Sequence, residues 1–581
     1  MSSNKEVEEL IRKYALENAV KFGGKCNPQA VLGKVFGERP ELKSSAKELA
    51  KLVRYISEEV NSLSLDEQKS LLSKYSFEAR AAQPKKEEKV LPPLPDVEKY
   101  GTVVTRFAPN PDCVLHLGSA RAIILSHDYA RMYGGKFILR FEDTDPRLKK
   151  ASLPFYDFIK EDLEWLGCKW DEEYIQSDRL PIYYEYAKKL LEVGGAYVCT
   201  CESERFKKLL LEKKSCPCRL LSSKENLERF DKMLDGTFGE GEAVLRIKTD
   251  LEHPNPAVRD WPALRIVDTK KHPHPRVGSK YRVWPLYNFS AGIDDHLMGI
   301  THIIRGKEHY TNMIRQKYMY AHLKWEYPTA IHYGRLKIEG GVLSKSKIMQ
   351  GISKGLYSGF DDPRLATFKA LRRRGILPET IRQIIHEVNI KPVDATISWS
   401  TLYSINKKLV DPIAPRYFAV FDPIVLVIKN FIEKREIVLR KHPNVDSMGY
   451  RSIKLIPEDG AVKVYISKND IELIKKANIF RLMGFANLTD LVLKDSIAEA
   501  KFHSFDVETA KKFSAPLIHW VPVKDCIKVL MVTSEGSLIE GFGERGLIEA
   551  PLDSIVQLER EGFARVDSKQ DNTIKLYFST R

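Results

Sequence analysis

A strand that runs into a helix, which leads into a second strand, limits the fold of this chain more than any other feature. Residues 101–107 (GTVVTRF) and 136–143 (KFILRFED) have the apolar character of buried strands, and residues 118–135 between them have that of a helix ending at paired glycines. Because strands joined by a crossover helix lie parallel, this stretch predicts a βαβ unit and hence an α/β domain with a parallel sheet.

The turn between the first strand and this helix carries His116 and Gly118. Ligands of parallel sheets bind beyond the carboxyl ends of the strands, and the free N–H groups and positive partial charge of a helix N-terminus favour phosphate. A glycine lets a flat ring or a phosphate approach the backbone, and a histidine can donate to a phosphate oxygen. Taken alone, however, this pattern is more often a capping histidine beside a packing glycine.

A second candidate element lies far along the chain. Residues 333–347 (YGRLKIEGGVLSKSK) form two strand-like halves around a Glu-Gly-Gly turn, which predicts a β-hairpin that leads to Ser344, Lys345 and Ser346. Lysines beside small hydroxyl residues on such a hairpin can clamp a triphosphate while charge builds up in phosphoryl displacement. By itself the segment is more often a solvated turn, so its weight comes from its pairing with the strand-to-helix turn.

Length and patterning indicate several domains. The 581 residues exceed the roughly 250–300 at which one core stops growing. Amphipathic helical patterns occupy residues 1–75, helical signals return over 357–410 with a helix start at Asp362-Pro363, and short alternating strands dominate after residue 411. The last region favours β-barrels.

Charge and hydropathy restrict the class of protein. Lysine and arginine outnumber aspartate and glutamate by 93 to 78, a net charge of +15, which fits nucleic-acid binding and equally fits plain solubility. No apolar run reaches the ~18 residues of a membrane span, and the polar start differs from a signal peptide. We therefore expect a cytoplasmic protein that does not bind membranes.

The two elements together resemble the two signature motifs of class I aminoacyl-tRNA synthetases, at 116–119 and 342–346. Ser119 and Val342 depart from the commonest forms of these motifs as the glutamyl/glutaminyl branch does. Further segments extend the resemblance to archaeal-type glutamyl-tRNA synthetases across most of the chain: TRFAPNPDCVLHLG, LRFEDTDP, DLEWLGCKWDE, DDHLMGITHIIRGKEH, LSKSK, APRYFAVFDP, IHWV and EREGFARVDS.

The resemblance implies a multidomain fold around an α/β Rossmann-like class I catalytic domain. The expected parts are an N-terminal helical module (1–80), a linker (81–99), the first half of the catalytic domain (100–198), an inserted acceptor-stem-binding domain (199–280), the second catalytic half with the signature hairpin (281–356), a helical connecting domain (357–410) and C-terminal all-β anticodon-binding barrels (411–581).

The activity implied by the resemblance is ligation of L-glutamate to the 3′ end of its tRNA, with ATP and Mg²⁺. The glutamate carboxylate attacks the α-phosphorus of ATP, pyrophosphate leaves, and the terminal ribose hydroxyl of tRNA takes the acyl group from glutamyl adenylate. Glutamine tRNA would also receive glutamate. The protein positions reactants and stabilises charge. The residues that match ATP-contacting positions are His116, Gly118, Ser119, Ser344, Lys345 and Ser346.

Carried over by motif, the glutamate pocket consists of Arg106, Glu142, Tyr287 and Arg305. Glu142 suits the α-ammonium group, Arg106 and Tyr287 orient the carboxylates, and Arg305 matches the arginine that glutamyl enzymes place against the γ-carboxylate. Glutamine would leave this buried guanidinium without its counter-charge, a loss of ~3–5 kcal/mol or ~10²–10³-fold. Without the motif, Arg305 would be read as a surface arginine at a strand end.

Other functions are separated from this one by single features. Glutaminyl-tRNA synthetase is the nearest alternative, and Arg305 argues against it because glutaminyl enzymes carry an uncharged residue there. A non-catalytic tRNA-binding relative would have no use for an intact His116, Gly118 and Lys345. A small nucleotidyltransferase would not need the long β-rich tail.

Four of the eight cysteines form two C-x-C pairs: Cys199, Cys201, Cys216 and Cys218. Eight cysteines in a large chain without a secretion signal argue against a disulfide framework. Four thiolates can close a tetrahedral structural zinc site, here from two short hairpins, although the usual spacing is C-x₂-C. Reduced free thiols are the alternative.

Several basic residues are candidates for contact with tRNA, whose unpaired bases splay onto protein surfaces. Arg416 and Arg451 match arginines that read anticodon bases in glutaminyl relatives. Residues 372–374 (RRR) either contact backbone phosphates or form a solvated charge run. The N-terminal helices are either a tRNA-contacting appendage or a docking site for a partner protein.

Overall fold

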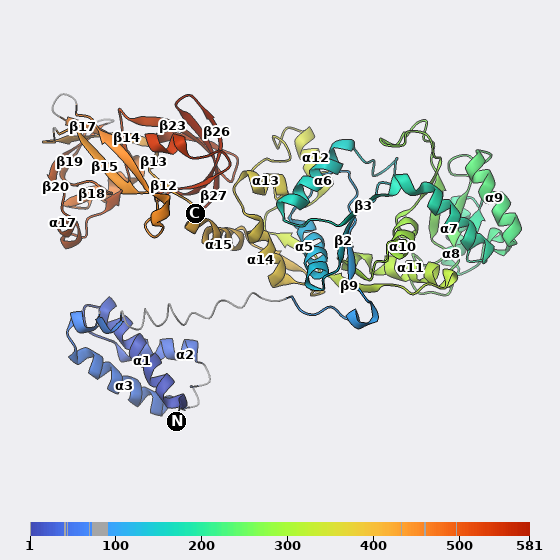
Figure 1. The fold of residues 1–581 in the computed structure, drawn as a ribbon, viewed down its shortest axis with the longest axis horizontal. Helices are drawn as coiled ribbons and strands as arrows, with labels where there is room; N and C mark the ends of the chain where they lie inside the picture. Colours follow the sequence, from blue (N-terminus) through green and yellow to red (C-terminus); the bar gives the residue numbers. More distant parts are fainter. Residues whose placement is uncertain are drawn as a thin grey trace. The chain divides into compact units, whose positions relative to one another are not determined.

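The computed structural model describes residues 2–39, 42, 45–68, 70–72, 91–431, 433–457, 461–494 and 497–581. The chain divides into two compact units, residues 1–90 and 91–581 (Figure 1). Of the expected linker, residues 81–90 lie outside the described residues, and residues 91–99 belong to the second unit. Within the described ranges no helix is both long enough and apolar enough to cross a bilayer.

The first unit is helical, as its periodicity predicts. Its helices are α1 (Ser2–Lys21), α2 (Pro28–Glu38) and α3 (Ala46–Ser62). Ile11, Val31 and Val53, one from each helix, are buried in a common core. Helix α2 begins at the sequence Asn27-Pro28, where the asparagine side chain accepts a hydrogen bond from the Gln29 N–H at 3.0 Å.

The second unit begins with the predicted βαβ unit, which confirms the α/β reading. The strands β1 (Val104–Phe107) and β2 (Lys136–Phe141) flank α5 (Leu117–Met132) and pair in parallel, and β2 also pairs in parallel with β3 (Glu172–Ile175) through α6 (Leu153–Trp165). The strands β8 (His302–Gly306) and β9 (Thr329–Tyr333) form another parallel pair. The Thr301 N–H donates to the Val104 carbonyl at 3.0 Å, so β8 lies beside β1.

An antiparallel sheet of four strands interrupts this α/β region. In the described part of the chain its order is β4 (Ala196–Cys199), β5 (Val244–Ile247), β6 (Pro262–Ile266) and β7 (Val283–Pro285). The associated helices are α7 (Leu180–Glu192), α8 (Ser203–Leu211) and α9 (Ser223–Asp235). The chain then returns through α10 (Tyr287–Leu297) and α11 (Tyr310–Leu323) to β8 and β9.

The signature segment does not form the expected β-hairpin. Strand β10 (Leu336–Ile338) pairs in parallel with β11 (Ala395–Ile397), a partner nearly sixty positions away, and not with residues 342–344. The chain turns at Gly340, whose φ of +63° suits glycine. Lys345 and Ser346 then begin α12 (Lys345–Ser353). The hairpin prediction was wrong because residues 341–344 form no strand and the chain enters α12 directly after the turn.

Helices connect this region to the C-terminal strands, as expected for residues 357–410. They are α13 (Phe368–Arg373), α14 (Pro378–Val388) and α15 (Trp399–Val410). The helix predicted to start at Asp362 does not: its carboxylate instead accepts hydrogen bonds from Ser358 N at 2.9 Å and Arg364 Nε at 2.8 Å within a turn. Thr367 caps α13 by accepting from Ala370 N at 3.1 Å.

The C-terminal region is all-β apart from short helices, as the alternating pattern predicts. Among the described residues it contains two seven-stranded sheets. One runs β12 (Arg416–Tyr417), β25 (Ile555–Leu558), β26 (Gly562–Gln570), β27 (Thr573–Thr580), β23 (Cys526–Val532), β24 (Leu538–Glu544) and β13 (Ala419–Phe421). The other runs β21 (Leu517–Ile518), β18 (Ile479–Leu482), β19 (Asn487–Lys494), β20 (Ile497–Ser504), β14 (Pro423–Lys429), β17 (Ala461–Ser467) and β22 (Val521–Pro522), and β15 (Arg435–Arg440) pairs with β16 (Tyr450–Leu455).

Candidate active site

The turn between β1 and α5 holds His116 and Gly118 in one hydrogen-bonded cap. His116 is the N-cap residue of α5, and its Nδ1 accepts a hydrogen bond from the Gly118 N–H at 3.1 Å. The proton of the neutral ring is therefore on Nε2, which is left as a donor. Burial, with the nearby Lys345 ammonium, lowers the pKa of His116 to about 4, so the ring is neutral at pH 7.

The close approach of this ring requires glycine at position 118. A Cβ there would lie 2.9 Å from two His116 ring atoms, a distance that real Cβ atoms essentially never show. The adjoining cavity has a volume of about 450 Å³ and is lined by both residues and by Tyr333, Leu336 and Leu343, among others. Cavities of this size hold small-molecule ligands of nucleotide dimensions.

Residues of the second signature segment lie against the same turn. The Lys345 Nζ donates to Asp112 Oδ1 at 2.6 Å and to the Asn110 carbonyl at 3.5 Å, both in the loop between β1 and α5. The hydroxyl groups of Ser344 and Ser346 lie 3.1 Å apart at the start of α12. Ser119 is in the first turn of α5, and its N–H donates to the His116 carbonyl at 2.8 Å. The two predicted signature elements therefore meet.

A buried network of charges lies at the ends of β1 and β2. Arg106 Nε donates to Asp295 Oδ1 at 3.0 Å, and Arg140 bridges Asp295 at 2.8 Å and Glu142 Oε1 at 2.9 Å. Burial would raise the pKa of Asp295, but Arg106 and Arg140 outweigh it and hold that pKa below its usual value. Burial raises the pKa of Glu142 despite Arg140. Two guanidinium groups thus face two carboxyl groups.

Arg305, in β8, differs from these arginines because no carboxylate among the described residues forms an ion pair with it; Asp295 acts on it only through its charge, which helps to raise the Arg305 pKa against burial. Its guanidinium donates to Tyr327 Oη at 3.0 Å, Gln316 Oε1 at 3.2 Å and Tyr287 Oη at 3.4 Å, all uncharged groups. The residue is only 5% exposed, and its Nε has no partner among the described residues. A buried charge without a counter-ion is costly, so this geometry favours an anionic ligand.

The histidines beside Arg305 add no further positive charge to the pocket. Burial, with the Arg305 guanidinium, lowers the pKa of both His309 and His332 to about 4, so both rings are neutral at pH 7. The ring of Tyr287 lies 5.5 Å from that of His309. The four residues predicted for the glutamate pocket fall into two hydrogen-bonded pairs. Arg106 is connected to Glu142 through Asp295 and Arg140, and Arg305 donates directly to Tyr287.

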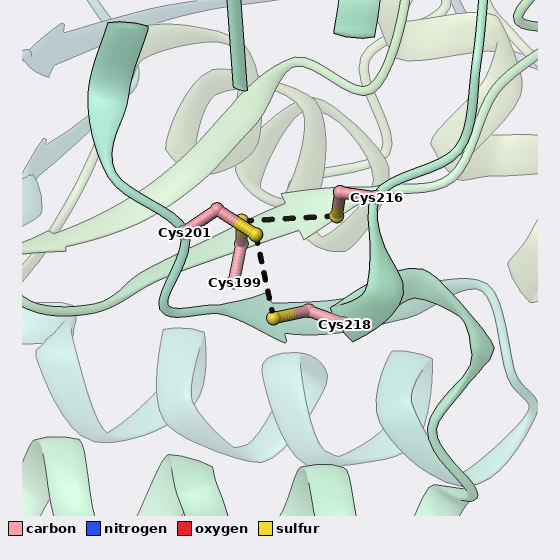
Figure 2. Close-up of side chains that lie close together, drawn as sticks. All are labelled: Cys199, Cys201, Cys216 and Cys218. Carbon is pink, nitrogen blue, oxygen red and sulfur yellow. Dashed lines mark hydrogen bonds between the residues drawn. The ribbon is translucent and has the colours of Figure 1, made fainter. Parts of the chain in front are cut away.

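The four clustered cysteines converge in the inserted region. Figure 2 shows their sulfur atoms facing one another, with Cys199 Sγ 3.9 Å from Cys216 Sγ and Cys201 Sγ 3.7 Å from Cys218 Sγ. All four sulfurs lie within 4.8 Å of one another. Four thiolates about 2.3 Å from one zinc ion are separated by about 3.8 Å in a tetrahedron, so the arrangement fits zinc.

The supports of these cysteines differ from the two predicted hairpins. Cys199 ends β4 and Cys201 follows two residues later, whereas Cys216 caps a 3₁₀ turn (Pro217–Leu220) that contains Cys218. The Cys199 hydrogen bond lowers the pKa of the Cys216 thiol to about 5, and Arg229 Nη1 donates to Cys218 Sγ at 3.3 Å. These effects favour the thiolate form at Cys216 and Cys218, whereas the hydrogen bond with Cys216 raises the pKa of Cys199 and burial raises that of Cys201.

The two predicted anticodon-contacting arginines lie in the C-terminal sheets, away from the cavity. Arg416 begins β12, is partly exposed, and lies 3.5 Å from Asp411 Oδ1. Arg451, on β16, is buried and its guanidinium pairs with Glu544 of β24. A contact between Arg451 and a nucleotide base therefore requires that this ion pair opens.

Sequence reasoning assigned no role to three residues that the structure brings into the site: Asp112, Arg140 and Asp295. All three fall inside segments that carried the resemblance, PNPDC, LRFED and DDHLM. Counting the charged residues in those segments could have identified them, because each segment contains an ionisable residue to which no role was assigned. Their partners, however, come from other elements.

Comparisons with known proteins identify the family of this chain. Residues 102–412 match the family described as tRNA synthetases class I (E and Q), catalytic domain, and residues 414–502 and 517–567 match its anti-codon binding domain. The glutamate–tRNA ligase of Pyrococcus furiosus is 53% identical over 98% of this chain and 99% of its own, and that of Thermococcus kodakarensis is 51% identical over 99% of each. A crystal structure of the glutamate-tRNA synthetase from Elizabethkingia anophelis covers 54% of this chain and 71% of its own at 24% identity, with a TM-score of 0.39. Because the catalytic-domain match alone spans more than half of its residues, the chain belongs to the class I tRNA synthetases of the E and Q group.

Proposed function

We propose that this chain is a glutamate–tRNA ligase that forms glutamyl adenylate from L-glutamate and ATP and transfers the glutamyl group to tRNA. The observation that carries this proposal is Arg305, a buried guanidinium surrounded by hydroxyl and amide groups and without an ion-pair partner among the residues that the structure describes. The γ-carboxylate of glutamate supplies the missing charge. The neutral amide of glutamine does not, which argues against the glutaminyl alternative.

The remaining pocket groups suit the other end of glutamate. Glu142 accepts from Arg140 through one oxygen and retains a second for the α-ammonium group. Arg106 and Tyr287 orient the carboxylates, and Asp295 holds Arg106 in place. Because the α-carboxylate is then fixed relative to the β1–α5 turn, the protein contributes to the reaction chiefly by positioning.

ATP fits the cavity beside the β1–α5 turn. Position 118 has no room for a side chain, His116 Nε2 is a free donor, and the start of α12 brings Lys345 nearby. We assign His116, Ser119, Ser344, Lys345 and Ser346 to the phosphates and Gly118 to the adenine face. Mg²⁺ accompanies ATP and neutralises phosphate charge. The glutamate oxygen attacks the α-phosphorus while pyrophosphate leaves, and the tRNA hydroxyl then displaces AMP from the acyl carbon.

The experiment that tests this function is ATP–pyrophosphate exchange with glutamate and with glutamine, each with and without tRNA. We expect glutamate to support ATP–pyrophosphate exchange and glutamine not to support it. Exchange driven by glutamine and not by glutamate would overturn the assignment. Aminoacylation of purified glutamate and glutamine tRNAs with labelled glutamate tests our further proposal, made on resemblance, that both are charged.

We also propose that Cys199, Cys201, Cys216 and Cys218 hold a structural zinc ion, on the strength of the sulfur separations. Zinc would tie the end of β4 to the 3₁₀ turn and so stabilise the inserted region. Metal analysis should find about one zinc per chain, and a chelator should lower the melting temperature. Absence of zinc together with unchanged melting would leave the free-thiol alternative.

For tRNA, we propose that Arg416 contacts the anticodon, because it is partly exposed and its Nε has no partner among the described residues. The burial of Arg451 and Glu544 favours a supporting role in which this pair holds β16 against β24. Arg416→Gln should raise the KM for tRNA without changing the KM for ATP. The N-terminal unit is proposed as a tRNA appendage or a partner-docking module; its removal raises the KM for tRNA only in the first case.

A further inference from the structure

The loop between β1 and α5 presents two oxygen atoms to the signature lysine. The Lys345 Nζ donates to the Asp112 carboxylate at 2.6 Å and to the Asn110 carbonyl at 3.5 Å. The side chains of Lys345 and Asp112 are 36% and 24% exposed. Nothing in the reaction described above uses Asp112, although it neutralises a lysine assigned to the phosphates.

The Asp112 side of this ion pair is held firmly. Asn110 lies between two prolines, whose φ angles are fixed. The carbonyls of Pro109 and Pro111 accept hydrogen bonds from Glu142 N and Ser152 N, each at 2.9 Å, and Leu115 N donates to Asp162 Oδ2 at 3.3 Å. The loop is therefore tied to β2 and α6 at three points, and Asp112 is a fixed reference point.

The Lys345 side is the one that can move. Its ammonium lies at the end of a flexible four-carbon chain in the first turn of α12. It already acts on the phosphate-binding turn, because its charge contributes to the low pKa of His116. Because Lys345 lies within electrostatic range of His116, its side chain is near enough to the turn for a rotation to bring the ammonium to a ligand bound there.

We propose that Asp112 is a positioning residue that holds the Lys345 ammonium on the β1–α5 loop before ATP binds, yields it to the phosphates, and takes it back when pyrophosphate leaves. The inference rests on the proposed function. No covalent bond is made or broken in this step; the charge-assisted hydrogen bond to Asp112 is replaced by one to a phosphate oxygen. Since the resting ion pair must open before Lys345 reaches ATP, Asp112 weakens ATP and pyrophosphate binding and favours product release.

The test compares wild type with Asp112→Asn and Asp112→Ala, using calorimetric binding of ATP with Mg²⁺ and tRNA-supported pyrophosphate exchange with glutamate. Part-exposed ion pairs of this kind correspond to factors of about two to five. We expect the Kd for ATP and the inhibition constant of pyrophosphate to fall by that factor in both variants, with an unchanged KM for glutamate. The matched control is Glu172→Gln, which removes the negative charge from the Lys136–Glu172 ion pair between β2 and β3. This variant should change neither the Kd for ATP nor the inhibition constant of pyrophosphate.

The lysine itself provides the decisive arm of the experiment. In a Lys345→Met background, Asp112→Asn should no longer alter ATP affinity, because Asp112 acts through Lys345. An equal gain in both backgrounds would mean that the carboxylate repels the phosphates directly, and weaker ATP binding by Asp112→Asn would mean that the pair persists in the complex; either result overturns the proposal. A different result would show that the proposed function is wrong: wild-type protein that binds ATP but catalyses no glutamate-dependent pyrophosphate exchange.

Discussion

Replacing Arg305 by glutamine should separate glutamate recognition from ATP binding. Removing one partner of a buried ion pair costs about 3–5 kcal/mol, so kcat/KM for glutamate should fall about 150- to 4,000-fold. The residues assigned to ATP lie at the β1–α5 turn and at the start of α12, and within the described structure none of them hydrogen-bonds Arg305, so the Kd for ATP should change less than about two-fold.

The ligand-free variant should keep its stability, which distinguishes a binding arginine from a structural one. Among the described residues no carboxylate forms an ion pair with Arg305, and the Tyr327 hydroxyl and Gln316 amide oxygen already hydrogen-bond each other at 2.7 Å, so losing the buried charge offsets the hydrogen bonds lost to them. We expect the free energy of unfolding to change by less than about 1 kcal/mol. Arg374→Gln offers the contrast: this arginine is 1% exposed and donates to Tyr403 Oη at 2.7 Å and to backbone carbonyls, so its loss should destabilise by about 2–3 kcal/mol.

The assay is tRNA-supported pyrophosphate exchange at varied glutamate, with ATP binding measured by calorimetry and unfolding by denaturant. Arg315→Gln is the matched control, because Arg315 lies on α11 and donates to the Ala257 carbonyl at 2.6 Å, outside the pocket. Equal losses of glutamate and ATP affinity in Arg305→Gln would refute the reasoning. So would a loss of stability as large as that of Arg374→Gln.

Three further outcomes follow from the same structure. Gly118→Ala should push the His116 ring out of its cap and weaken ATP binding at least about ten-fold, with calorimetry as the measurement. Burial raises the pKa of Asp162 to about 7, above its unfolded value near 3.8, so the wild-type protein loses stability as pH rises from about 4 to 7. In denaturant unfolding, Asp162→Asn should therefore gain about 2–4 kcal/mol relative to wild type over that interval. A difference between the two proteins that does not depend on pH would contradict this. Arg451→Gln should destabilise by about 3–5 kcal/mol because the buried Glu544 carboxyl loses its ion-pair partner and keeps the Phe418 N–H as a donor, and adding Glu544→Gln should restore most of the loss.

The sequence predicted local structure where one element carries its own signal. The alternation of β1, α5 and β2 was readable because buried strands and a glycine-terminated helix follow one another without interruption. The buried positions of β17 alternate as predicted, with Val462, Val464 and Ile466 inside. In both places the period of the apolar residues and the turn residues agree, so no distant partner is needed to decide the structure.

The sequence failed where the partner of a segment is distant. Strand β10 pairs with β11, which no local signal indicates, and the expected hairpin is absent. The arginine run 372–374 was expected to meet phosphate or solvent, yet Arg373 pairs with Asp361 at 2.7 Å and Asp567 at 3.3 Å, and Arg374 is buried against β27. Both residues fasten the helical region to the C-terminal sheet.

Residue type alone could not identify which arginine of the pocket is available to a substrate carboxylate. Arg106, Arg140 and Arg305 are all buried arginines at strand ends, and each could be proposed for a substrate carboxylate. Asp295, on α10, and Glu142 pair with the first two. Arg305 instead donates to the Gln316 amide on α11 and to the hydroxyl groups of Tyr327 and Tyr287. Arginines that pair with carboxylates inside the chain are less available to a ligand, whereas Arg305, surrounded by hydroxyl and amide groups, is the better candidate to bind a substrate carboxylate. That distinction depends on which helix packs against which strand, and so it becomes visible only in the folded structure.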